Sequence, residues 1–206
     1  MIYIFIIAIF IFSVVIHEVA HGTAANYLGD DTAKIAGRLT LNPIKHLDPI
    51  GSVVVPLLLI ISNAGIVFGW AKPVPVNPSK LRDQKYGDAK VALAGPLANL
   101  AVALVFGIIL RIAFNFDQFP YQLATIFSYI VFINILLAIF NLVPIPPLDG
   151  SHILFTFLPD TYRDLKIFLS QYGFIILIFF IFFLFRFLFP FISFIYKGIV
   201  GAPLII

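Results

Sequence analysis

The sequence contains no cysteine among its 206 residues. Disulfide bonds are therefore excluded, and so is any metal centre that depends on thiolate ligands. A metal ion bound by this chain must take its protein ligands from histidine nitrogens and carboxylate oxygens.

Charged residues are also scarce, and they are unevenly distributed. Only 11% of the residues are charged, whereas 61% are hydrophobic. The stretches without any Asp, Glu, Lys or Arg are 1–16, 49–71, 91–110, 118–148 and 167–185. Several of them approach or exceed the roughly 20 apolar residues that a transmembrane helix needs. The sequence therefore predicts an all-α polytopic protein in a lipid bilayer, and its net charge of +3 gives no reason to expect a nucleic-acid partner.

The first apolar run carries polar residues in a pattern with chemical meaning. If residues 3–28 form a helix, His17 and His21 lie four positions apart and project from the same face. Two imidazoles so placed can bind one Zn²⁺, and Glu18 between them can act as general base toward a water molecule. Ionisable residues at membrane depth are costly, which favours a functional role over chance. The pattern predicts a zinc hydrolase with catalytic Glu18.

A catalytic zinc site usually has three protein ligands and one open position. The candidates for the third ligand are Asp149, His152, His46, Asp48 and Asp160. We favour Asp149 because it follows the proline-rich stretch 144–147, which stops the preceding helix and stiffens the chain. The simpler alternative for Asp149 is a helix N-cap. His152 is interpreted as a polar lining residue and remains the alternative ligand, whereas His46 and Asp48 are interpreted as surface residues of a basic loop.

Charge distribution predicts the topology of the helices. The hydrophobic segment 49–69 has basic residues on both flanks, and lysine and arginine are retained on the cytoplasmic side. We therefore expect 49–69 to be re-entrant or laterally packed rather than a crossing. Helix 88–114 is then the single crossing between helices 3–28 and 121–143, so these two helices run parallel. Their parallel course brings His17 and His21 to the same end as Asp149. That end is predicted to face the cytoplasm.

Three motifs in this order resemble the site-2 protease family of intramembrane zinc metalloproteases. They are His17-Glu18-Val19-Ala20-His21, Gly95-Pro96-Leu97-Ala98-Asn99, and Asn141 with Pro144, Pro146, Leu148, Asp149 and Gly150. The basic region after the first helix and the segment Gly69–Pro78 extend the resemblance over most of residues 10–155. The chain has no room for the PDZ or CBS modules of many relatives, so a short form of the family is expected.

The resemblance implies a core of three helices that holds one Zn²⁺ through His17, His21 and Asp149. It also implies that Asn141 and Asn99 contact the substrate backbone or the developing oxyanion. A membrane-associated β-hairpin, here 31–41, is expected to hold the substrate in an extended form. The implied substrate is the transmembrane segment of a single-span membrane protein, cut by regulated intramembrane proteolysis.

We expect one integral-membrane peptidase domain over 1–206, with a catalytic core at 3–155 and a C-terminal membrane segment at 167–206. That segment can form one tilted span with an interfacial tail or two short crossings. A multi-pass protein of a bacterial or archaeal cell membrane is expected. The alternative function is a zinc transporter or a non-catalytic metal-binding membrane protein. A transporter needs polar residues along the whole depth of the bilayer, whereas here they cluster at one depth.

Overall fold

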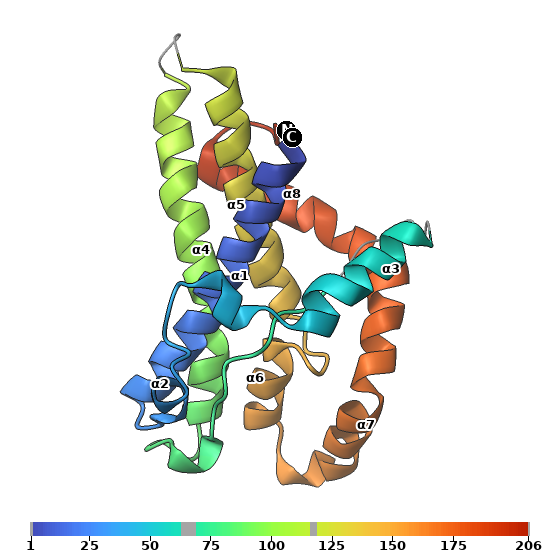
Figure 1. The fold of residues 1–206 in the computed structure, drawn as a ribbon. Coiled ribbons are helices and arrows are strands. Elements are labelled where there is room, and N and C mark those ends of the chain that lie inside the picture. The colour runs from blue at the N-terminus through green and yellow to red at the C-terminus, as the bar shows by residue number, and fades with distance from the viewer. Residues whose placement is uncertain (1, 63–68, 116–118, 206) are drawn as a thin grey trace.

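The computed structural model of the protein describes residues 2–62, 69–115 and 119–205, and within them it contains helices and no strand (Figure 1). The long helices are α1 (Ile2–Tyr27), α4 (Gly87–Ala113) and α5 (Tyr121–Asn141). The shorter α-helices are α2 (Thr32–Ile35), α3 (Val55–Ile61), α6 (Asp149–Phe157), α7 (Arg163–Phe179) and α8 (Leu188–Val200). Within the described residues, four helical runs are long and apolar enough to cross a membrane. The prediction of an all-α polytopic membrane protein is confirmed.

The three long helices form the centre of the molecule. Helix α1 and helix α5 run in the same direction, and α4 runs in the opposite direction and packs against both (Figure 1). The ends of α1 and α5 and the start of α6 therefore lie at the same end of the bundle. This is the arrangement that the charge distribution predicts.

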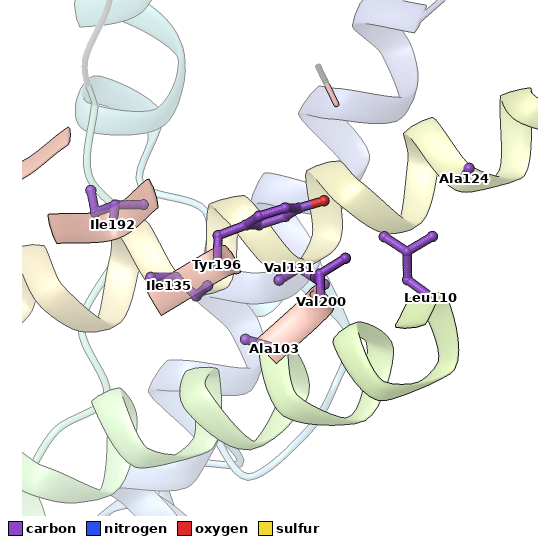
Figure 2. Close-up of a cluster of buried hydrophobic side chains, with 8 residues drawn as sticks. All are labelled: Ala103, Leu110, Ala124, Val131, Ile135, Ile192, Tyr196 and Val200. Atoms are coloured by element: carbon purple, nitrogen blue, oxygen red, sulfur yellow. The ribbon is translucent and has the colours of Figure 1, made fainter. Parts of the chain in front are cut away.

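The larger cluster of buried apolar residues lies at the other end, where α8 packs against α4 and α5 (Figure 2). Its members are Ala103, Leu110, Ala124, Val131, Ile135, Ile192, Tyr196 and Val200. Tyr196 is fully buried, and its hydroxyl lies 2.7 Å from Ser128 Oγ, so its polar atom has a partner. Gly107 permits the close approach of α8, because a Cβ at that position would lie 2.4 Å from Ile199 Cγ2.

The C-terminal apolar region forms one bent helical run over Asp160–Val200. Between α7 and α8, π-type turns over Phe180–Leu184 and 3₁₀ turns over Phe185–Phe187 interrupt the α-helical geometry. In Figure 1 the run starts beside α6 at one end of the bundle and finishes at the end where α1 begins. It follows one bent path, which favours a single crossing over two short ones.

The predicted β-hairpin at 31–41 is wrong. The segment contains α2 and then a turn at Gly37, whose φ of 63° suits glycine. Asp30 favours the helix because its carboxylate accepts hydrogen bonds from the backbone N–H and the hydroxyl of Thr32. The loose alternation of apolar residues was misleading, since Ile35 is 75% exposed whereas Arg38 is buried.

Segment 49–69 begins as π-type turns over Pro49–Val54 and continues as α3. The Asp48 carboxylate starts it by accepting hydrogen bonds from the N–H groups of Ile50 and Gly51. With seven residues, α3 is too short to span a bilayer. The described part of the segment thus agrees with lateral packing, and residues 63–68 lie outside the described residues.

Single 3₁₀ turns occur at Pro43–His46, Pro78–Lys80 and Asp160–Tyr162.

Candidate metal centre

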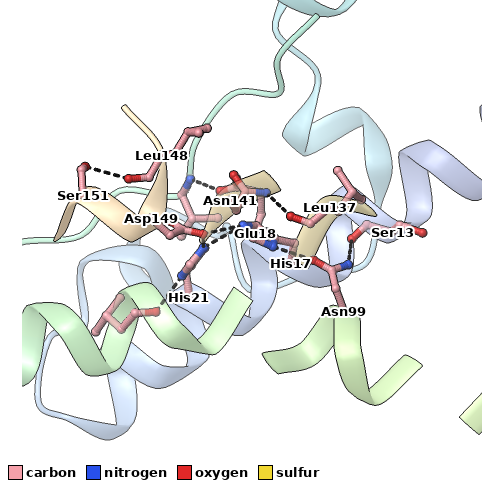
Figure 3. Close-up of polar contacts among 12 residues, drawn as sticks. Ser13, His17, Glu18, His21, Asn99, Leu137, Asn141, Leu148, Asp149 and Ser151 are labelled. Atoms are coloured by element: carbon pink, nitrogen blue, oxygen red, sulfur yellow. Dashed lines mark hydrogen bonds and ion pairs between the residues drawn. The ribbon is translucent and has the colours of Figure 1, made fainter. Parts of the chain in front are cut away.

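Successive turns of α1 carry the two histidines of the candidate site. His17 and His21 are both buried, and their Nε2 atoms lie 3.0 Å apart (Figure 3). The two rings meet edge to face, with centroids 4.6 Å apart. This is the geometry that a spacing of four residues on a helix predicts.

Asp149 joins the histidines from the first turn of α6. Its Oδ2 lies 3.1 Å from His17 Nε2 and 3.3 Å from His21 Nε2. Gly150 allows the chain to turn sharply here, because a Cβ at this residue would lie 2.3 Å from the carbonyl oxygen of Leu142. The chain after α5 therefore folds back tightly enough to place Asp149 over α1.

The three residues fit a metal ion. Their ligand atoms all lie within 4.8 Å of one another. Asp149 Oδ2 is buried and has no hydrogen-bond partner among the described residues, which is costly for a carboxylate oxygen unless a cation neutralises it. Two imidazoles and a carboxylate are a donor set found in catalytic zinc sites.

Space for an ion depends on α4. Gly95 faces the two histidines, and a Cβ there would lie 2.4 Å from His21 Nε2 and 2.7 Å from His17 Nε2. Any side chain at this position would push into the ligand atoms. The glycine of the second motif is therefore required by the site itself, and Pro96 beside it continues the same helix.

The far side of each imidazole ring is also held. His21 Nδ1 lies 2.7 Å from the carbonyl oxygen of Val91, and His17 Nδ1 lies 2.7 Å from Asn99 Oδ1. A carbonyl oxygen only accepts hydrogen bonds, so His21 Nδ1 must carry the proton. With protons on both Nδ1 atoms, both Nε2 lone pairs point toward Asp149. Contacts of this kind orient histidine ligands in metal sites.

Glu18 is held by a segment far away in the sequence. Its Oε2 accepts a hydrogen bond of 2.8 Å from the backbone N–H of Val74. Val74 belongs to the extended segment 69–77, which the prolines predict. Two side chains fix that segment: Arg38 Nη2 donates to the Lys72 carbonyl at 2.7 Å, and Asp30 Oδ2 accepts from the Asn77 N–H at 2.6 Å.

The two predicted substrate-contacting asparagines lie in different settings. Asn99 is fully buried on α4, and its side chain hydrogen bonds within the protein, to His17, Ser13 and Asn134. These hydrogen bonds support a histidine, and contact of Asn99 with a substrate stays a prediction. Asn141 is only partly buried at the end of α5, where its Nδ2 donates to the Leu137 carbonyl at 2.9 Å (Figure 3). Its contact with a substrate stays a prediction.

The other candidate ligands lie outside the cluster. The exposed side chain of His152 meets Asp88, with Nδ1 2.9 Å from Oδ2. His46, expected at the surface, is instead 1% exposed and lies 2.9 Å from the Thr40 carbonyl oxygen. Asp48 caps the turns that follow it, and Asp160 is exposed. The sequence predicts Asn134 as a buried amide of helix 121–143, but it assigns neither Asn134 nor Ser13 to the site, although polarity within an apolar helix is a signal for both.

Comparison with known proteins adds independent findings. The sequence model of Peptidase family M50 matches residues 117–184, which include Asp149. The chain is 40% identical to "Putative zinc metalloprotease YwhC" of Bacillus subtilis, over 84% of this chain and 77% of that protein. It is 34% identical to "Putative zinc metalloprotease Rip2" of Mycolicibacterium smegmatis, over 86% of this chain and 66% of that protein. A shorter match, 46% identical, covers 32% of this chain and 33% of "Putative zinc metalloprotease MJ0611" of Methanocaldococcus jannaschii. No solved structure matches significantly.

Proposed function

The chain belongs to Peptidase family M50, the site-2 protease family, and on that premise we propose that it cuts a peptide bond in or near the transmembrane segment of a membrane protein. We assign one Zn²⁺ per chain to His17, His21 and Asp149. The observation that carries the proposal is the convergence of these ligands from α1 and α6, with the buried Asp149 Oδ2 lacking a hydrogen-bond partner among the described residues. Glu18 lies between the histidines in the sequence and is assigned the catalytic base.

The chemistry divides between the ion and the chain. Bound zinc supplies a Lewis acid that makes water nucleophilic at neutral pH. Glu18 takes the proton from the attacking water and then delivers it to the leaving amine nitrogen. The Val74 N–H engages one carboxylate oxygen of Glu18 and so fixes its direction, while the second oxygen serves proton transfer. Asn141, at the end of α5, is proposed to donate to the substrate backbone or oxyanion.

The substrate is proposed to be a single-span membrane protein cut in regulated intramembrane proteolysis. The carbonyl groups of a transmembrane helix are hydrogen bonded within the helix, so the cleaved region must unwind before attack. The extended segment 69–77, which lies beside Glu18, is suited to neighbour an unwound chain. Helix-breaking residues in a substrate would lower the free-energy cost of unwinding.

The site is proposed to face the cytoplasm of a bacterial or archaeal cell. Basic residues gather in the segments at the end of the bundle where the site lies, and cytoplasmic segments of membrane proteins are enriched in lysine and arginine. They are Lys34, Arg38, Lys45, Lys72, Lys80, Arg82, Lys85, Lys90, Arg163 and Lys166. The relatives come from bacteria and an archaeon, which supports the assignment of the membrane.

The test is cleavage of a single-span substrate by the purified protein in detergent, with zinc content measured on each variant. Glu18→Gln should abolish cleavage and keep zinc, whereas Asp149→Ala should lose both. Asp160→Asn is the matched control, because it removes an exposed carboxylate away from the cluster. Cleavage that survives Glu18→Gln would exclude the proposed mechanism, and full zinc retention in Asp149→Ala would exclude Asp149 as a ligand.

A further inference from the structure

Three buried polar side chains form a hydrogen-bonded chain behind His17. They are Ser13 on α1, Asn99 on α4 and Asn134 on α5, and they are between 0% and 3% exposed. Each lies in a helix that is apolar enough to span a membrane. Amides buried at such depth are costly unless every donor and acceptor is satisfied. The direction of each hydrogen bond therefore carries information.

The direction is set by atoms that can only accept. Asn134 Nδ2 lies 2.9 Å from the Ile130 carbonyl oxygen, which fixes the orientation of the Asn134 amide. The same Nδ2 donates to Ser13 Oγ at 2.9 Å. Asn134 Oδ1 is then turned toward Asn99 Nδ2, which lies 2.8 Å away and also donates to the Ser13 carbonyl oxygen at 3.1 Å.

This order leaves Asn99 Oδ1 as the acceptor that faces His17. His17 Nδ1 lies 2.7 Å from it and must therefore carry the proton, so Nε2 keeps the lone pair that a metal ion needs. In His21 the proton is also held on Nδ1, because this atom donates to the backbone carbonyl oxygen of Val91, which cannot rotate. His17 instead depends on a side-chain amide, and an amide can turn over unless something holds it.

We propose that Asn134 is a positioning residue for the metal site, although it touches neither metal ligand nor catalytic base. Together with the Ser13 carbonyl oxygen, Asn134 fixes the Asn99 amide, and in this way it helps to select the tautomer and the ring position of His17 from a third helix. This inference rests on the proposed function, because it assigns His17 to the metal. It predicts that loss of Asn134 weakens metal binding through Asn99 and not through general loosening of the bundle.

The experiment compares Asn134→Leu with Ser128→Ala in the full chain in detergent. Leucine is similar in size to asparagine and removes the amide. Ser128→Ala is the matched control, because it breaks another buried hydrogen bond from α5, to Tyr196 on α8, that has no link to His17. Zinc affinity is measured by chelator competition, the ligand geometry by the visible spectrum of the Co²⁺ form, and the folding of the metal-free protein by thermal unfolding.

Asn134→Leu should weaken zinc affinity about tenfold and alter the Co²⁺ spectrum, in line with the loss of partners behind metal ligands. Ser128→Ala should keep the zinc affinity within about twofold of the parent, even if its unfolding temperature falls as far as that of Asn134→Leu. Asn99→Ala should weaken zinc affinity at least as much as Asn134→Leu does. A double variant with both substitutions should lose no more affinity than Asn99→Ala alone. Asn134→Ser provides the same comparison if the leucine variant does not fold.

Three results would overturn the inference: parental zinc affinity in Asn134→Leu, an equal loss of affinity in Ser128→Ala, or additive losses in the Asn99 and Asn134 double variant. Its failure is distinguishable from failure of the proposed function. If the parent chain binds no zinc, the metal assignment itself is wrong. If the parent binds zinc and only the Asn134 comparison fails, the metal site stands and this inference alone is excluded.

Discussion

The backbone N–H of Val74 donates a hydrogen bond of 2.8 Å to the carboxylate of Glu18. A residue of an extended loop segment thus holds the assigned catalytic base on a membrane helix. Because the contact uses the backbone, the identity of the Val74 side chain matters less than the presence of its N–H.

Val74→Pro removes that N–H and should lower the turnover rate while zinc content stays at the parental level. A hydrogen bond to a charged group contributes about 1.5–3 kcal/mol, which corresponds to roughly a tenfold to hundredfold loss. Val74→Ala keeps the N–H and should stay near the parental rate. Steady-state cleavage of a single-span substrate checks the prediction, and equal rates for the proline and alanine variants would contradict it.

Gly95→Ala should reduce zinc binding severely, because the new methyl group would lie against the Nε2 atoms of His17 and His21. The matched control is Gly198→Ala on α8, where an added Cβ meets no atom within 4 Å. That control should keep its zinc and match or slightly exceed the parental unfolding temperature. Metal analysis of the two purified variants decides, and a zinc-loaded Gly95→Ala would show that the ligands can move aside.

Removal of zinc should destabilise the protein, because an ion at the proposed site would join α1 to α6 and neutralise the buried Asp149 carboxylate. Binding to the folded state alone stabilises it by about 2.7 kcal/mol when free zinc exceeds Kd by about a hundredfold. The unfolding temperature should therefore rise with added zinc in the parent and stay constant in Asp149→Ala. An equal rise in both proteins would mean that zinc stabilises them from another site.

Asp30 should make stability depend on pH in the acid range. Burial raises its pKa, but hydrogen bonds from the Thr32 hydroxyl, the Asn77 N–H and the Thr32 N–H outweigh burial and leave the pKa below its usual value. A depressed folded-state pKa means that the contribution is present above the unfolded pKa of about 4 and is lost as pH falls through the folded value.

Thermal unfolding in detergent at several pH values tests this. The parent should be more stable than Asp30→Asn at neutral pH, and the difference should shrink as the pH falls below about 4. Asp160→Asn, at an exposed position, should follow the parent throughout. A constant gap between the parent and Asp30→Asn at every pH would show that Asp30 contributes by shape and not by charge.

Much of this architecture could be predicted because a few strong signals act locally. The uncharged runs predict α1, α4 and α5 to within a few residues, since the bilayer demands long apolar helices. The spacing of His17 and His21 predicts that both side chains project from the same face of α1. The prolines before Asp149 predict that a stiff backbone holds its carboxylate in a fixed position. Each of these inferences depends on residues that are close together in the sequence.

The errors concern contacts between segments that are distant in sequence or weakly patterned. The loose alternation over 31–41 predicts strands, but the hydrogen bond that the Asp30 carboxylate accepts from the Thr32 N–H and the burial of Ala33 favour a short helix. The sequence also does not reveal the hydrogen-bond partners of Asn99, because His17 and Asn134 lie on other helices and meet it only in the folded bundle. The burial of His46 depends in the same way on a contact across a loop, with Thr40.

The order of the ligands along the chain has a consequence for biogenesis. A ribosome releases α1, with His17 and His21, long before it releases Asp149, which follows both α4 and α5. The nascent chain therefore carries an incomplete centre while its helices enter the membrane one after another. On the proposed function, peptidase activity should arise only after α6 has folded back onto α1, so a partly inserted chain should be inactive.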